Sequence, residues 1–173
     1  MPLAHDEDFL QRATDADALL LGNLLELYIH DLSAIFPHVT LGPDGRFGYA
    51  KLPLYFTETA TRFPFLIRRA ERILGFALVT VGSPASSDAT VLDVAEFFVL
   101  RQFRREGVAR RAAMRLWEMM PGQWTVRVGV RNTDAMRFWT DVLSEFTNTV
   151  ANDVTRSDEN PDWRVYSFIA PKR

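Results

Sequence analysis

No cysteine occurs among the 173 residues of the chain. This absence excludes disulfides, thiolate metal sites and a covalent cysteine mechanism. Histidine is also scarce, and His5 and His38 have no partner at the spacing of metal ligands, so we expect no metal. Chemistry on this chain has to rely on other side chains and on the backbone.

Long apolar runs are missing too, since none approaches the ~20 residues that span a bilayer. Met1–Phe9 carries acids and no basic apolar leader, so we expect no secretory signal, a cytoplasmic location and no membrane partner. The formal net charge is only -2, which argues against wholesale nucleic-acid binding. Apolar residues make up 47% of an evenly composed chain, which predicts a single domain over residues 1–173.

The most informative segment runs from Val91 to Arg111. It begins as a continuous apolar strand, passes through a basic turn that contains Gly107, and continues as a helix. The first amides of a helix have no helical acceptor, and the helix dipole adds positive charge there, so such a turn binds phosphate well. Gly107 lets a ligand approach the backbone, and the arginines around it attract a polyanion. A solvated basic turn is the alternative for this segment taken alone.

A second unit of the same kind follows. Trp124–Val130 is a β-branched strand, and Arg131–Trp139 follows it as a turn and a capped helix. Strand, helix, strand and helix in this order predict a parallel pair of strands whose carboxyl ends open on the same side, where ligands bind in open sheets.

These two segments resemble the signatures of the GNAT superfamily of acyl-CoA-dependent N-acyltransferases. The pyrophosphate loop of that family, Arg/Gln-x-x-Gly-x-Gly/Ala after its fourth strand, is matched by Arg104, Gly107 and Ala109. Its second signature, Asn-x-x-Ala-x-x-Phe/Leu-Tyr after the fifth strand, is matched by Asn132, Ala135 and Phe138. Both stand in the order and at the separation usual in the family.

The resemblance implies acetyl-CoA as co-substrate and assigns its contacts. The CoA pyrophosphate would bind the turn amides of Arg105, Glu106, Gly107, Val108, Ala109 and Arg110, with Arg104 framing the turn. The pantetheine would pair like an added strand with the backbone of Phe98, Val99 and Leu100. Asn132 would bond the pantetheine arm near the thiol, and Phe138 would pack beside it.

One departure from the family concerns the departing thiolate. Many members have a tyrosine that protonates it, where this chain has Trp139, whose indole N–H is no ordinary proton donor. Water or another tyrosine (Tyr28, Tyr55 or Tyr166) would replace it, or CoA would leave as a thiolate stabilised by local dipoles. Because the pKa of a thiol is only about 8.5, this is the less demanding half of the chemistry.

Deprotonation of an amine is the more demanding half, and Glu96 is the candidate catalytic base. It lies in the middle of the strand beside the expected acetyl group, among apolar neighbours that raise the pKa of a carboxyl. It could act directly or through a water. The alternative is a carboxylate paired with an arginine of a neighbouring strand. Strand alternation predicts that Asp93 faces the opposite way, which makes it a weaker candidate.

The remaining elements follow from periodicity and turn signals. Thr14–Asp17 is a helix start, and one long or broken amphipathic helix is expected over Ala18–Phe36. By the resemblance, Glu26, His30 and Asp31 on this helix could meet the substrate amine, or they could simply face water. The other expected elements are a glycine-rich loop at Leu41–Tyr49, a short helix from near Pro53, a hairpin of Phe63–Arg69 with Ile73–Val81, and final strands at Thr147–Val154 and Trp163–Ile169.

The expected fold is thus a mixed α/β arrangement of GNAT type. It has six to seven mostly antiparallel strands, a central parallel pair splayed to admit the cofactor, and helices on both faces. The hypothesis for function is an N-acetyltransferase that moves an acetyl group from acetyl-CoA to a primary amine by direct attack in a ternary complex. The alternatives are a non-catalytic acyl-CoA-binding sensor or interaction module, and a nucleic-acid binder that uses the arginine pairs.

The expected amine acceptor is a small molecule or a peptide. A modest excess of acids near the expected cleft, including Asp6–Asp8, is compatible with a cationic acceptor such as a polyamine, an aminoglycoside or a peptide amine, and chooses none of them. The resemblance also leaves a homodimer open.

Overall fold

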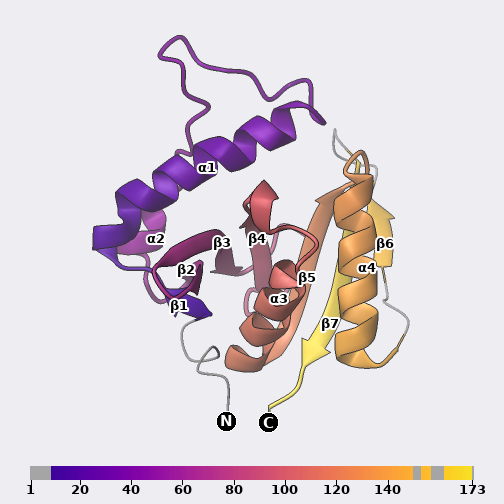
Figure 1. Ribbon diagram of the computed structural model, residues 1–173. Helices are drawn as coiled ribbons and strands as arrows, with labels where there is room; N and C mark the ends of the chain where they lie inside the picture. The colour runs from indigo at the N-terminus through magenta and orange to yellow at the C-terminus, as the bar shows by residue number, and fades with distance from the viewer. Residues whose placement is uncertain (1–8, 150–152, 157–161, 173) are drawn as a thin grey trace.

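The computed structural model describes residues 9–149, 153–156 and 162–172, and these form a seven-stranded sheet covered by helices on both faces (Figure 1). The strand order is β1-β2-β3-β4-β5-β7-β6. The strands are β1 Leu10–Arg12, β2 Arg62–Arg69, β3 Arg72–Val81, β4 Leu92–Val99, β5 Gly122–Gly129, β6 Asp153–Arg156 and β7 Trp163–Ala170. The helices are α1 Ala18–Ser33, α2 Leu54–Thr57, α3 Val108–Met119 and α4 Thr133–Thr147, with short 3-10 turns at Asp15–Asp17 and Arg101–Phe103.

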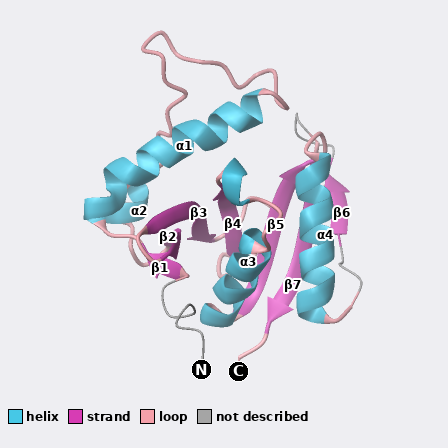
Figure 2. Cartoon of the chain, in the orientation of Figure 1, coloured by secondary structure: helices cyan, strands magenta, loops and turns pink. Residues whose placement is uncertain are grey.

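Two apolar cores lie on opposite faces of the sheet, as Figure 2 shows by the helices on either side. On one face, α1 and α2 pack on the sheet through residues such as Leu21 and Tyr55. On the other, Leu116 of α3 and Leu143 of α4 pack on the alternate strand residues. Burial of these side chains is the main favourable term that holds the three layers together.

The sheet confirms the predicted architecture. Every pair of neighbouring strands is antiparallel except β4 and β5, which are parallel. The parallel pairing joins Leu92–Val94 to Trp124–Val126 and covers only three residues of each eight-residue strand. Beyond Val94 the two strands diverge, visibly so in Figure 1. The predicted splay at the centre of the sheet is therefore present.

A β-bulge in β4 changes which side chains share a face. Val79 of β3 pairs with Val94, and the preceding Leu78 pairs with Glu96, so Ala95 is an extra residue in β4. Asp93 and Glu96 consequently point to the same face of the sheet. The prediction that Asp93 faces away from Glu96 was wrong, because simple alternation does not hold across a bulge.

Two predicted boundaries were also wrong. The long helix ends at Ser33 instead of Phe36, and Phe36 folds back into a buried position. The strand expected from Thr147 begins only at Asp153, with residues 150–152 outside the described part. Thr147 is instead the last residue of α4, and its hydroxyl donates to the carbonyl of Leu143 one turn earlier. Within the described residues, no helix has the length and hydropathy that a bilayer crossing requires.

The register of β3 against β4 predicts a large effect of an added methyl group at Gly75. A Cβ there would overlap the carbonyl oxygen of Phe98 and lie 3.0 Å from the Cα of Val99, both backbone atoms that cannot rotate away. We expect Gly75→Ala to lower the free energy of unfolding by about 3 kcal/mol in urea titrations. Gly22→Ala is the matched control, because the added methyl would lie 3.5 Å from the flexible Leu52 side chain and should stabilise α1 by about 0.5–1 kcal/mol. Equal stability of Gly75→Ala and the unsubstituted protein would contradict the register.

Candidate active site

A cleft of about 340 Å³ opens where β4 and β5 part. Its size falls in the range of small-molecule sites. The residues that line it come from α1, the loops around residues 36–51, both central strands, the start of α4 and the start of β7. They are Tyr28, Leu32, Phe36, His38, Val39, Lys51, Val94, Ala95, Glu96, Phe97, Val126, Arg127, Val128, Gly129, Asn132, Ala135, Trp139 and Trp163.

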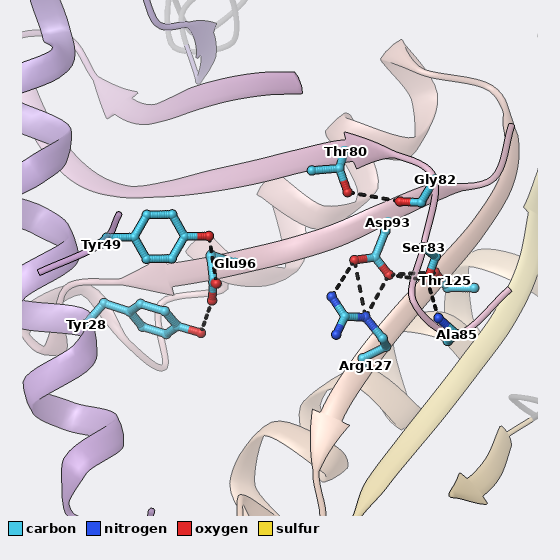
Figure 3. A network of polar contacts seen from close by, with 10 residues as sticks. All are labelled: Tyr28, Tyr49, Thr80, Gly82, Ser83, Ala85, Asp93, Glu96, Thr125 and Arg127. Carbon is cyan, nitrogen blue, oxygen red and sulfur yellow. Dashed lines mark hydrogen bonds and ion pairs between the residues drawn. The ribbon is translucent and has the colours of Figure 1, made fainter. Parts of the chain in front are cut away.

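Glu96 is the carboxylate that lines this cleft. Tyr28 donates a hydrogen bond of 2.8 Å to its Oε2 and Tyr49 one of 3.0 Å to its Oε1 (Figure 3). Burial raises the pKa of Glu96, while the two phenols and the positive charges of Arg127 and Lys51 oppose that rise. The sequence also allowed an ion pair between Glu96 and an arginine of a neighbouring strand. Within the described residues, Glu96 is instead hydrogen-bonded by two phenols.

Tyr49 was missed by the sequence reasoning, and of the tyrosines considered there, Tyr28 is the one that lines the cleft. Burial and the charge of Glu96 raise the pKa of both Tyr28 and Tyr49. Burial likewise raises the pKa of Tyr55 to about 12. The Tyr166 hydroxyl donates to the carbonyl of Met136 at 3.1 Å inside the core. Tyr166 is therefore a structural residue and lies away from the cleft.

Asp93 is fully buried and belongs to an ion-pair network beside Glu96 (Figure 3). Arg127 of β5 donates from Nη2 to Oδ2 at 2.8 Å and from Nε to Oδ1 at 3.1 Å. The hydroxyls of Ser83 and Thr125 donate to Oδ1 at 2.9 and 2.6 Å. The guanidinium also lies 5.8 Å from the ring centroid of Trp163. The network fixes Arg127 in the floor of the cleft.

The basic turn has the backbone that the sequence indicates. Gly107 precedes α3 with φ 73° and Arg105 has φ 66°, both in the left-handed region. The N–H of Arg111 makes the first helical bond, to the carbonyl of Gly107, at 3.0 Å. The amides of Val108, Ala109 and Arg110 therefore have no acceptor within the helix and point out of its amino end. Such a backbone can hold a phosphate group.

Several arginines of this turn are engaged in holding it. Arg104 donates from Nε to the carbonyl of Val99 at 2.8 Å and from Nη2 to Asp31 of α1 at 2.7 Å. Arg101 also pairs with Asp31, and Arg110 pairs with Glu145 of α4. The turn is thereby tied to helices on both faces of the sheet.

The sequence matches the model of the acetyltransferase (GNAT) family over residues 25–143, which is more than half of the chain. The chain belongs to the GNAT acetyltransferase family. The match includes α3, most of α4 and both strands of the parallel pair. The resemblance of the two signatures is therefore confirmed.

Solved GNAT structures share the whole fold. An N-acetyltransferase from Staphylococcus aureus Mu50 is 16% identical, with a TM-score of 0.64 over 94% of this chain and 98% of that one. An acetyltransferase from Thermus thermophilus is 15% identical, with a TM-score of 0.61 over 96% and 97%. A spermidine N-acetyltransferase from Vibrio cholerae, solved with CoA and spermine, is 12% identical, with a TM-score of 0.61 over 93% and 94%. A comparison with curated protein sequences gives no match.

The GNAT expectation for the pantetheine concerns the backbone of Phe98, Val99 and Leu100. The N–H of Leu100 already donates to the carbonyl of Leu74 across β3, at 2.8 Å. The backbone groups of successive residues in a strand bond to opposite neighbours. The backbone N–H and C=O of Phe98 therefore also point to β3, and those of Phe97 and Val99 point to the split. Of the three expected residues, Val99 alone turns its backbone toward the cleft side.

The second GNAT signature lines the other wall. Asn132 caps α4, since its Oδ1 accepts from the N–H of Ala135 at 3.2 Å. The Phe138 ring is stacked on Phe97 with centroids 6.2 Å apart. Trp139, in the place of the family tyrosine, is largely buried, and its ring centroid lies 5.1 Å from that of Phe97. The indole therefore shapes the cleft by packing.

The acids proposed to meet the amine are not among the residues that line the cleft. Glu26 accepts from the amides of Phe47 and Gly48, whose hydrogen bonds lower its pKa. Asp31 is bound by the turn arginines. His30 is exposed near Phe47. Glu26 and Asp31 therefore fasten loops to α1, and Asp6–Asp8 lie outside the described residues.

The buried Asp93 network generates a stability prediction. Asp93→Leu removes the carboxylate from the Arg127 guanidinium and from two hydroxyls, and we expect the free energy of unfolding to fall by about 3–5 kcal/mol. The double substitution Asp93→Leu with Arg127→Leu removes both charges and should regain at least half of that loss in urea titrations. A double variant as unstable as Asp93→Leu alone would show that the pair is not coupled as its geometry indicates.

Proposed function

We propose that the protein moves the acetyl group of acetyl-CoA directly to a primary amine within a ternary complex. Membership of the GNAT family supports acetyl transfer. The observation that carries the mechanism is the Glu96 carboxylate, which lines the cleft at the split and is held there by Tyr28 and Tyr49. A carboxyl whose pKa is raised by burial is suited to take a proton near neutral pH.

The proposed cofactor contacts follow the family signatures. The pyrophosphate binds the amides of the turn from Arg105 to Arg110, where the left-handed Gly107 brings them together. The pantetheine pairs with the N–H of Val99 along the edge of β4 that faces the split, because the Val99 carbonyl already accepts from Arg104. The side-chain nitrogen of Asn132 bonds the arm, because its oxygen already caps α4. Phe138 supports this wall through its stack on Phe97.

In the reaction the amine nitrogen attacks the thioester carbonyl carbon, and its proton passes to Glu96 directly or through a water. Collapse of the tetrahedral intermediate breaks the carbon–sulfur bond and releases CoA as a thiolate. Tyr28 is poorly suited as the acid for this step, since its raised pKa keeps the phenol protonated. The thiolate leaves on its own, because the pKa of a thiol is only about 8.5, and takes its proton from solvent.

The first prediction for this mechanism concerns the turn. Gly107→Glu places a carboxylate on the backbone that faces the pyrophosphate, and we expect acetyl-CoA affinity to fall at least 100-fold in calorimetric titrations. Gly45→Glu is the matched control, since Gly45 also has a left-handed φ of 76° and lies in the loop before Tyr49 with open space around it. It should bind acetyl-CoA like the unsubstituted protein. If the unsubstituted protein itself does not bind acetyl-CoA, the whole proposal is wrong.

The second prediction concerns the base. Glu96→Gln should lower kcat/KM about 10²–10⁴-fold and remove the acid limb of the pH profile, measured by thiol release. Because burial raises the pKa of Glu96 in the folded protein, its stabilising contribution is present at low pH and is lost as pH rises through that pKa. At pH 7 the glutamine variant should therefore be at least as stable as the parent.

Tyr49→Phe provides the complementary test. It removes a hydrogen bond that lowers the pKa of Glu96, so the acid limb should move to higher pH while activity persists above it. If the acid limb of the pH profile does not move in Tyr49→Phe and is still present in Glu96→Gln, the base is another group. A protein that binds acetyl-CoA but releases no thiol with any amine would instead be the acyl-CoA-binding module.

A further inference from the structure

The charges that line the cleft are unlike those that a polycation needs. Among the described residues that line it, Glu96 is the one carboxylate, and Arg127 and Lys51 carry the positive charges. Both cations act on the charge of Glu96. Glu26 and Asp31, which were expected to favour a cationic acceptor, are bonded elsewhere.

A polyamine would leave its further ammonium groups facing like charges. An acceptor with one amine and one anion would meet opposite charges at both ends, its ammonium at Glu96 and its anion at Lys51 and Arg127. Such complementarity distinguishes acceptors by repulsion as well as by attraction.

Arg127 is built to present a fixed guanidinium. Asp93 holds Nε and Nη2, Ser83 and Thr125 hold Asp93, and the ring of Trp163 lies beside the group. The Arg127 side chain is nevertheless 22% exposed, on the cleft side. A guanidinium in a fixed plane recognises a carboxylate better than a mobile ammonium does.

The rest of the acceptor side is apolar. Leu32, Phe36 and Val39 line the cleft from α1 and the loop after it, and Trp163 lines it from β7. Because Asn132, the proposed contact of the pantetheine arm, lines the same cleft of about 340 Å³, the part left for the acceptor suits a compact molecule with an apolar side chain.

We propose that the acceptor is an α-amino carboxylate with an apolar side chain, whose carboxylate is held by Lys51 and Arg127 while its amine faces Glu96. The proposal rests on the acetyl transfer proposed above. It names the acceptor class and assigns Lys51 and Arg127 as specificity-determining residues.

The first test measures binding, independently of turnover. Phenylalanine and phenethylamine share the aromatic chain and the amine and differ by the carboxylate. In calorimetric titrations of the protein saturated with CoA, we expect phenylalanine to bind at least tenfold more tightly than phenethylamine, and spermidine to bind more weakly than phenylalanine. If phenethylamine or spermidine binds as tightly as phenylalanine or more tightly, the proposal is wrong. It is also wrong if none of leucine, methionine and phenylalanine binds.

The second test uses variants and thiol release. Lys51→Met should reduce the preference for phenylalanine over phenethylamine, measured as a ratio of kcat/KM values, at least fivefold. The ratio cancels any effect of Lys51 on Glu96 itself. Lys172→Met is the matched control, because the chain's other lysine is exposed near its carboxyl end and should leave the ratio unchanged. An unchanged ratio in Lys51→Met overturns the role of that residue.

The two proposals fail in different ways. If phenylalanine binds to the CoA complex with the expected preference and no thiol is released, the acetyl transfer fails and the acceptor-site chemistry stands. If thiol is released with amines that lack a carboxylate as readily as with phenylalanine, acetyl transfer stands and the acceptor class is wrong.

Discussion

The interruption of the hydrogen bonding between β4 and β5 is the constraint on which the site depends. Two parallel strands that paired along their full length would leave no space at the centre of the sheet and no free backbone edge. Here pairing stops after Val94, and the bulge at Ala95 follows immediately. The bulge costs one ladder position, but it turns Glu96 into the opened space, on the strand whose Val99 N–H also faces the split. The interrupted pairing and the bulge together thus place the cleft beside the proposed base and beside the edge proposed for the cofactor.

Strand β4 carries two acids in different electrostatic surroundings: Asp93 is ion-paired, and Glu96 is hydrogen-bonded by phenols. Asp93 is fully buried and fully satisfied by a guanidinium and two hydroxyls, so its charge is neutralised where it lies. Glu96 is held only by phenols, which donate hydrogen bonds but bring no positive charge. Burial raises the pKa of Glu96, which suits it to exchange a proton, whereas Asp93 is held in its ion pair. A structural role and a proposed catalytic role therefore separate within three residues, because Arg127 of β5 bonds directly to Asp93 and acts on Glu96 only through its charge.

The two signature turns could be predicted from sequence because each is local. Gly107 and Asn132 determine their own turn and cap through backbone dihedrals and short-range bonds, and the order of strands and helices sets the parallel pair. What could not be predicted is tertiary. The bulge leaves no mark in the residues around Ala95, so alternation placed Asp93 on the wrong face. Tyr49 reaches Glu96 from a loop 47 positions away, and the acids of α1 find partners in the 40s loop and the basic turn. The sequence therefore indicated acids of α1 at the cleft, whereas in the structure those acids are bonded to loop residues outside it.

Packing accounts for Trp139 at the position of the family tyrosine. Trp139 packs between Phe97, Phe138 and Trp117, so a large apolar ring gains contacts that a phenol in the same place would not make. Its cost is the loss of a proton donor for the departing sulfur. In the proposed mechanism that cost is small, because the pKa of a thiol is only about 8.5 and CoA can leave as a thiolate that takes its proton from solvent.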